Sequence, residues 1–153
     1  MANSILAPVD LADLETARRV LAAAVRQSSG QDSVLTVMTV VPDLVGGLDY
    51  RYAIRGETGG SVDYDVREIV NEALARLNDL VAENAPEGMT INTIVRHGTI
   101  YEQILQVAEE LGVDQIVMGA HRPQLSDYLL GPNTARVVRH AKCSVNVIRH
   151  EGR

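Results

Sequence analysis

Short apolar runs that alternate with longer amphipathic stretches constrain the fold of this chain more than any other feature. Runs rich in Val, Ile and Leu predict five strands, over residues 4–10, 33–41, 89–98, 113–119 and 143–150. Apolar residues three and four positions apart predict four helices, over residues 11–28, 62–85, 100–112 and 133–141. Strands that alternate with helices form crossover units and a mainly parallel sheet, and strands that are apolar throughout indicate a sheet buried on both sides. The sequence therefore predicts an α/β fold, with helices on both faces of an open parallel sheet.

The chain length of 153 residues is typical of one domain, and we expect residues 1–153 to form a single domain. One segment departs from the regular pattern, because residues 43–62 hold five of the twelve glycines and show neither a helical nor a strand period. A loop of this length is unusual in a compact domain. We therefore predict a flexible loop over about residues 43–62.

The apolar residues of each predicted helix form a stripe that should face the sheet. In the helix over 62–85 this stripe comprises Val66, Ile69, Val70, Ala73, Leu74, Leu77 and Val81. In the helix over 100–112, which Gly112 should end, the residues expected to point inward are Ile100, Ile104, Leu105, Val107, Ala108 and Leu111.

Composition argues against several classes of partner. The net charge is −6 and the chain has no Phe and no Trp, whereas nucleic-acid sites use basic patches and aromatic stacking. No run approaches the roughly 18 apolar residues of a membrane span, and the first residues do not resemble a signal peptide, so we expect no membrane insertion. The single cysteine, Cys143, excludes an internal disulfide. It fits a reducing cytoplasm and is expected to be a buried structural thiol.

The predicted architecture indicates where to look for a site. In an open parallel sheet, ligands bind outside the carboxyl ends of the strands, at the point where the strand order reverses. The residues that follow the predicted strands are Pro8, Val9 and Asp10; Val40, Val41 and Pro42; Arg96, His97 and Gly98; and Gly119 to Pro123.

The last of these sets opens a stretch bounded by two glycines, "GAHRPQLSDYLLGPN" from Gly119 to Asn133. Gly119 would let the backbone turn sharply or let a ligand approach. Gly131 is expected to be the N-cap of the last helix, where Asn133 and Thr134 would offer free N–H groups to an anion, and Arg122 could add a cation. The alternative is that both glycines serve only the turn and that Arg122 is solvated.

At this stretch the sequence resembles the universal stress protein family, whose nucleotide-binding members carry G-x-x-G-x9-G-[ST] after the fourth strand. A bacterial subgroup has G-S-H-R-P followed by Y-L-L-G-S-N, which is similar to this stretch at nearly every position. The similarity continues in "ILAPVD", in "LTVMTVVP", in residues 95–119 and in "VVRHAKCSVNVIR". It covers the whole chain except about residues 43–62.

The resemblance implies a Rossmann-like five-stranded sheet of order 3-2-1-4-5 and a homodimer formed through residues 144–149, an edge strand with unpaired backbone groups. It places the adenine contacts on Asp10 and Val40, and the phosphate and ribose contacts on the glycine-bounded stretch. The full set of residues expected to contact nucleotide is Pro8, Val9, Asp10, Val40, Gly98, Met118, Gly119, His121, Arg122, Pro123, Gly131, Pro132, Asn133 and Thr134.

One departure from the family pattern concerns the phosphates. The family's Ser or Thr after the last glycine is Pro132 here, so a hydroxyl and a backbone N–H are missing. Proline is nevertheless favoured at the first position of a helix, which leaves Asn133 and Thr134 to donate. We expect weakened binding, tilted toward fewer phosphates, more than abolished binding.

The function that follows is regulatory binding of ATP, ADP or AMP, with Mg²⁺ as an optional companion and an unidentified protein as the partner. Two alternatives stay open: a nucleotide-independent interaction module, and a slow ATPase. The four histidines lack metal-ligand spacing and no nucleophile stands with His121, so we expect neither a catalytic residue nor a metal centre. Asp10 would bind adenine or Mg²⁺, or else cap a helix that begins near Leu11.

Overall fold

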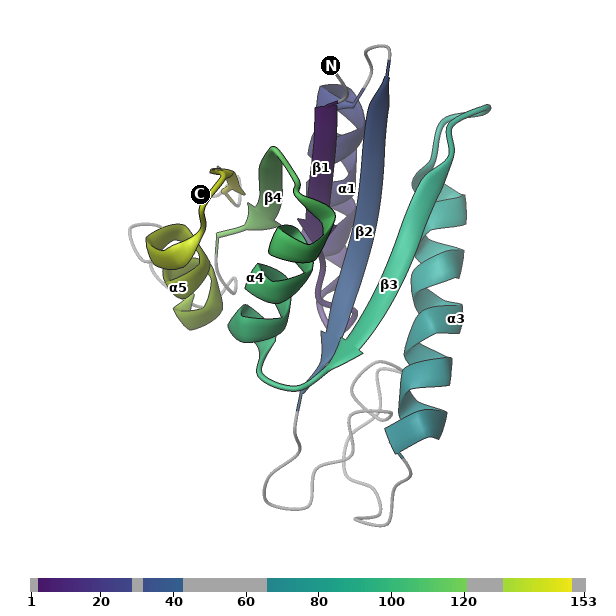
Figure 1. Cartoon of the computed structure of the whole chain (residues 1–153). Coiled ribbons are helices and arrows are strands. Elements are labelled where there is room, and N and C mark those ends of the chain that lie inside the picture. The colour runs from purple at the N-terminus through teal and green to yellow at the C-terminus, as the bar shows by residue number, and fades with distance from the viewer. Residues whose placement is uncertain (1–2, 29–31, 43–65, 121–130, 150–153) are drawn as a thin grey trace.

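The computed structural model describes residues 3–28, 32–42, 66–120 and 131–149. They form one five-stranded parallel sheet of order β3-β2-β1-β4-β5, which confirms the predicted fold (Figure 1). The strands are β1 (Asn3–Pro8), β2 (Ser33–Val41), β3 (Ile91–His97), β4 (Gln115–Gly119) and β5 (Ser144–Ile148). The helices are α1 (Leu14–Gln27), α3 (Val66–Asn84), α4 (Ile100–Leu111) and α5 (Pro132–His140). The loop predicted over residues 43–62 lies outside the described residues.

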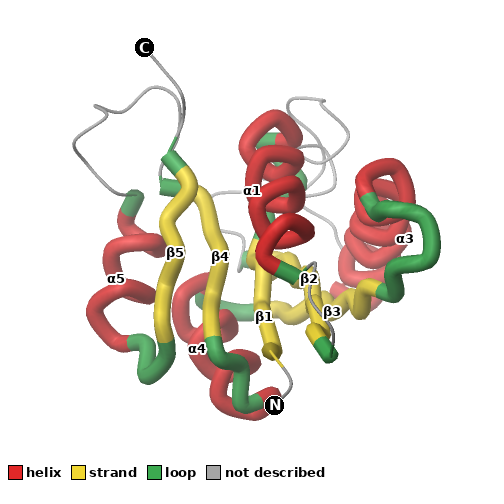
Figure 2. Tube along the Cα trace, turned by 90° about the horizontal axis from the view of Figure 1, so that it is seen from above, coloured by secondary structure: helices red, strands yellow, loops and turns green. Residues whose placement is uncertain are grey.

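Helices cover the sheet on both faces. Figure 2 shows α1 and α3 on one side of the strands, and α4 and α5 on the other. The first face buries Ile5, Val37, Ile69 and Leu77 among others. The second face buries Leu6, Met38, Ile104 and Ile116. Neighbouring residues of one strand therefore enter opposite cores, which explains why the strands are apolar throughout.

The strand order reverses beside β1, with β2 and β3 on one side of it and β4 and β5 on the other, and there the pairing of the sheet is incomplete. β1 pairs with β2 along its whole length, from Asn3 opposite Ser33 to Pro8 opposite Met38. It pairs with β4 only at Ile5 and Leu6. Beyond Leu6, β1 and β4 are no longer paired, so a space can form between their carboxyl ends.

Helix boundaries and burial follow the predicted stripes with two corrections. Helix α1 begins at Leu14, three residues after the expected start. Leu111, which was expected to face inward, is 44% exposed. It is the last residue of α4, and the chain turns away at Gly112 in a left-handed conformation, so no neighbouring turn covers its side chain. Gly112 ends the helix as predicted.

None of the described helices is long and apolar enough to cross a membrane.

Candidate functional site

A cavity of about 350 Å³ lies at the carboxyl ends of β1, β2 and β4, next to the point where the strand order reverses. It brings together most of the residues expected to contact nucleotide: Pro8, Val9, Asp10, Val40, Met118, Gly119, Gly131, Pro132, Asn133 and Thr134. Gly98 does not line it; its N–H donates to the carbonyl of Val41 at 3.0 Å. His121, Arg122 and Pro123 lie outside the described residues.

The inner wall of the cavity is apolar. It is formed by Val20 of α1, Ile104 of α4 and Met118 of β4, all of them buried. Val9, directly after β1, and Val40 of β2 flank the same space, and each is less than a tenth exposed. A flat apolar ring of a ligand would be buried against this wall, and polar groups at the rim of the cavity would fix the orientation of the ligand.

Asp10 stands on the rim of the cavity and is exposed. Its Oδ1 accepts the N–H of Ala12 at 2.9 Å, and its backbone carbonyl accepts the N–H of Asp13 at 3.0 Å. These two bonds shape the turn between β1 and α1. The alternative prediction, that Asp10 caps the helix, is therefore wrong. Helix α1 begins only at Leu14, and Asp10 stabilises the turn that precedes it. Among the described residues no hydrogen bond reaches Oδ2 of Asp10, so this oxygen can accept one from a ligand.

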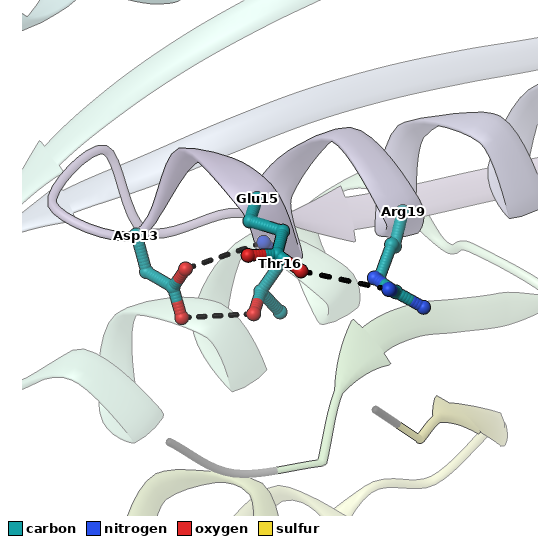
Figure 3. Close-up of polar contacts among 4 residues, drawn as sticks. All are labelled: Asp13, Glu15, Thr16 and Arg19. Atoms are coloured by element: carbon teal, nitrogen blue, oxygen red, sulfur yellow. Dashed lines mark hydrogen bonds and ion pairs between the residues drawn. The ribbon is translucent and has the colours of Figure 1, made fainter. Parts of the chain in front are cut away.

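Asp13 is the N-cap of α1. Its Oδ1 accepts the N–H of Thr16 at 3.2 Å, and its Oδ2 accepts the Thr16 hydroxyl at 2.8 Å. Figure 3 shows the carboxylate turned toward Thr16, next to the ion pair of Glu15 with Arg19 at 3.5 Å. Both oxygens of Asp13 are thus committed to the fold, although the side chain lines the cavity.

Replacing Asp13 by alanine should cost about 1 kcal/mol of stability, because the first turn of α1 loses its cap. For a chain of this size the melting temperature should fall by about 2–4 °C. Asp13→Asn is the matched control, since asparagine caps as well as aspartate. Thermal unfolding followed by circular dichroism measures both variants. An alanine variant that melts with the wild type would contradict the capping role.

The start of α5 forms the opposite rim. Gly131 is its N-cap and Pro132 its first residue, as predicted. The Gly131 N–H donates to the carbonyl of Ala120 at 2.8 Å. Since proline has no N–H, the first donors without an acceptor inside the helix are the N–H groups of Asn133 and Thr134. Both residues line the cavity.

The hydroxyl of Thr134 is already engaged. It donates to the carbonyl of Gly119 at 2.7 Å, and the side chain is buried. The bond joins the end of β4 to the first turn of α5, so the two glycine-bounded ends of the stretch are held together. Thr134 can therefore offer a ligand its N–H, while its hydroxyl fixes the geometry of the rim.

Gly119 has a structural reason to be glycine. A Cβ built on it would stand 2.7 Å from Cγ2 of Thr16 in α1, a distance that no ordinary side chain tolerates. The close approach is to the protein's own helix, and this packing alone requires a residue without a side chain. A contact with ligand remains a prediction for Gly119.

Several residues that line the cavity were missed by sequence reasoning: Ala12, Asp13, Thr16, Ala17, Val20, Thr39, Ile100 and Ile104. Pro42, named above among the residues that follow the strands, also lines it. Three of the missed residues had a signal in the sequence. Asp13 and Thr16 have the spacing of an N-cap and its partner, and Thr39 is a polar residue in a mostly apolar strand. The Thr39 hydroxyl donates to the carbonyl of Val9 at 2.8 Å, which ties β2 to the chain just past β1.

Among the described residues, no group of three or more His, Cys, Asp or Glu side chains is placed to hold a metal ion. A second, smaller cavity of about 280 Å³ lies at the opposite end of β4 and β5, between the last turns of α4 and α5. It contains none of the predicted site residues. Cys143 lines it and is half-buried, less buried than predicted.

Burial raises the pKa of the Cys143 thiol, and the carboxylate of Asp114 raises it further. The thiolate, which is the reactive form, is therefore scarcer at neutral pH than in a free cysteine. We expect alkylation by iodoacetamide to be slower than that of glutathione, with a pH–rate profile displaced to higher pH. Asp114→Asn should move the profile part of the way back. A profile that matches glutathione would contradict this expectation.

Comparison with known proteins places the chain in a family. Residues 1–149 match the universal stress protein family, and the chain belongs to it. It is 31% identical to universal stress protein G of Shigella flexneri, over 97% of this chain and all of that protein. The solved structure of MJ0577, a universal stress protein of Methanocaldococcus jannaschii, superposes with a TM-score of 0.75 at 22% identity, over 100% of this chain and 99% of that one.

Two further structures share the fold and hold nucleotides. A universal stress protein in complex with cAMP superposes with a TM-score of 0.62 at 17% identity, over 97% of both chains. A family member from Arabidopsis thaliana with AMP bound superposes with a TM-score of 0.63 at 14% identity, over 98% of this chain and 93% of that one.

Proposed function

We propose that this chain binds an adenine nucleotide in the cavity at the carboxyl ends of β1, β2 and β4. The observation that carries the proposal is the composition of the cavity wall. Residues expected at the adenine, Asp10 and Val40, and residues expected at the phosphates, Gly131 and Asn133, line one space of about 350 Å³. That volume lies within the range of small-molecule sites.

The two ends of the cavity suit the two ends of a nucleotide. Val9, Val40 and Ile104 offer an apolar surface to the base, and the second oxygen of Asp10 can accept from an exocyclic amine. The first turn of α5 offers two N–H groups and a partial positive charge to a phosphate. The nucleotide would lie across the end of the sheet, between α1, α4 and α5.

The family relationship supports the same ligand class, because two structural neighbours hold AMP and cAMP. ATP, ADP and AMP are all candidates for this chain. Among the described residues that line the cavity, Asp10 alone has a carboxylate oxygen without a hydrogen bond. One carboxylate is not a metal cage, so any Mg²⁺ would enter with the phosphates of the ligand.

Asp10→Asn tests the proposal in thermal unfolding experiments with and without nucleotide. Ligand at one hundred times its Kd should raise the melting temperature of the wild type by about 5–10 °C. Asparagine keeps an oxygen for the Ala12 N–H but loses the charge, so we expect about tenfold weaker binding with the fold intact. Asp79→Asn, at an exposed position of α3, is the matched control. If nucleotide raised the melting temperature equally in both variants, Asp10 would not be a binding residue.

The mode of action that we propose is regulatory binding of the nucleotide without turnover, in the cytoplasm. The protein would act as a homodimer, and a protein partner would bind to this homodimer. The dimer contact is expected at β5, which is an edge strand of the sheet and exposes unpaired backbone groups on its outer side. Light scattering should give twice the chain mass of 16.6 kDa. Val147→Pro, which removes a backbone donor from the strand, should give the monomer mass.

Pro132 favours a second candidate, a nucleotide-independent interaction module. Proline at the first position of α5 removes one N–H that would otherwise face a phosphate. If the remaining donors are too few, the cavity stays unused and the protein acts through its surface alone. Absence of any nucleotide-dependent stabilisation in the wild type would favour this candidate.

A further inference from the structure

Arg136 is an exposed cation of α5, one turn beyond the cavity-lining residues at the start of the helix, and neither the sequence pattern nor the family match assigns it a role. It follows Pro132 by four residues and Asn133 by three, so it lies on the same side of α5 as these two cavity-lining residues. Side chains on a helix lean toward its N-terminus. The Arg136 side chain therefore extends toward the turn where a phosphate would sit.

The guanidinium rests on an aromatic ring. Its central carbon lies 4.9 Å from the centre of the Tyr101 ring. Tyr101 is in the first turn of α4, directly after Ile100, which lines the cavity from the other side. The guanidinium is thus held between the first turns of α4 and α5, the two helices whose N-termini border the cavity.

In this position no described residue uses the donors of Arg136: no carboxylate of the described residues pairs with it, and its guanidinium donates no hydrogen bond to them. A cation–π contact at an exposed site is weak, whereas a guanidinium binds phosphate through two parallel charge-assisted hydrogen bonds. A phosphate within reach would therefore draw Arg136 away from the ring.

We propose that Arg136 is a specificity-determining residue that binds the outer phosphates of a nucleoside di- or triphosphate, and that Tyr101 holds its guanidinium in place before the nucleotide binds. The inference rests on the proposed function and deepens it. Pro132 deprives the first turn of α5 of one N–H donor for a phosphate. Arg136, one turn later in the same helix, supplies a positive charge instead. The preference expected from Pro132 alone, for fewer phosphates, is thereby reversed.

Titration calorimetry with AMP, ADP and ATP tests this on the full chain. Arg136→Ala should weaken ATP and ADP binding about tenfold, and AMP binding much less, because the α-phosphate stays on the α5 N-terminus. Arg136→Lys should recover part of the loss, since the charge remains and the paired hydrogen bonds do not. The salt dependence of ATP binding should also become shallower in Arg136→Ala.

Arg139→Ala is the matched control, with the same change of charge on the same helix, one turn further from the cavity. It should keep the wild-type ratio of ATP to AMP affinity, and both variants should melt like the wild type. An unchanged ratio in Arg136→Ala, with a wild type that binds nucleotide, overturns this inference alone. A wild type that binds none of the three nucleotides overturns the proposed function and this inference with it.

Discussion

Leu77→Ala should destabilise the protein by about 2–5 kcal/mol, which is a large part of the stability of a domain of this size. Leu77 has no exposed surface and lies in the core between α3 and the sheet. Truncation removes apolar contacts and leaves a cavity that the surrounding side chains fill only in part. Urea unfolding followed by circular dichroism measures the loss as a lower midpoint with an unchanged slope.

Leu111→Ala makes the same chemical change at a residue that is 44% exposed. We expect a loss of less than about 1 kcal/mol there, because little surface is returned to water and no closed cavity forms. The pair also tests the correction made to the apolar stripe of α4. Equal losses for the two variants would contradict the placement of Leu77 in the core or of Leu111 at the surface.

Gly119→Ala should cost about 1–3 kcal/mol, because the new Cβ would overlap the side chain of Thr16 and force α1 away from β4. The same movement would displace Asp13 and Thr16, both of which line the cavity. We therefore expect weaker nucleotide binding as well as a lower melting temperature.

Thr16→Ser provides the rescue for this variant. Serine lacks Cγ2, the atom that the new Cβ would meet, and keeps the hydroxyl that donates to Asp13. In a double-mutant cycle, the loss of unfolding free energy in the double variant should be about 1 kcal/mol smaller than the sum of the losses in the two single variants. Additive losses would show that Gly119 is required for a reason other than its contact with Thr16.

The sequence was sufficient for the architecture because its signals are local and repeated. Alternation of apolar runs and amphipathic stretches predicted the α/β class, and the resemblance carried by "GAHRPQLSDYLLGPN" supplied the strand order. The residues that follow the strands were then expected to meet at one end of the sheet. Val9, Val40, Gly119 and Gly131 do meet there.

The rest depended on contacts between distant parts of the chain. Two aspartates precede α1, and only the backbone of the turn decides that Asp13 caps the helix and that Asp10 does not. The reason for glycine at 119 is a side chain in α1, more than a hundred positions earlier, which no local pattern reveals. Ile100 enters the cavity wall because α4 packs beside α5. The apolar periodicity of α4 predicted that Ile100 is buried, but it did not predict that α5 lies next to it.

Nucleotide binding by the cavity is measured by calorimetric titration of the purified protein with ATP, ADP and AMP, each with Mg²⁺. Carried-over nucleotide must first be removed by unfolding and refolding, so that an occupied cavity is not mistaken for an inert one. We expect micromolar binding at one site per chain, and we expect it to be lost in Gly131→Val, where a branched side chain stands at the N-cap of α5. Heats that equal those of buffer for all three nucleotides would contradict it.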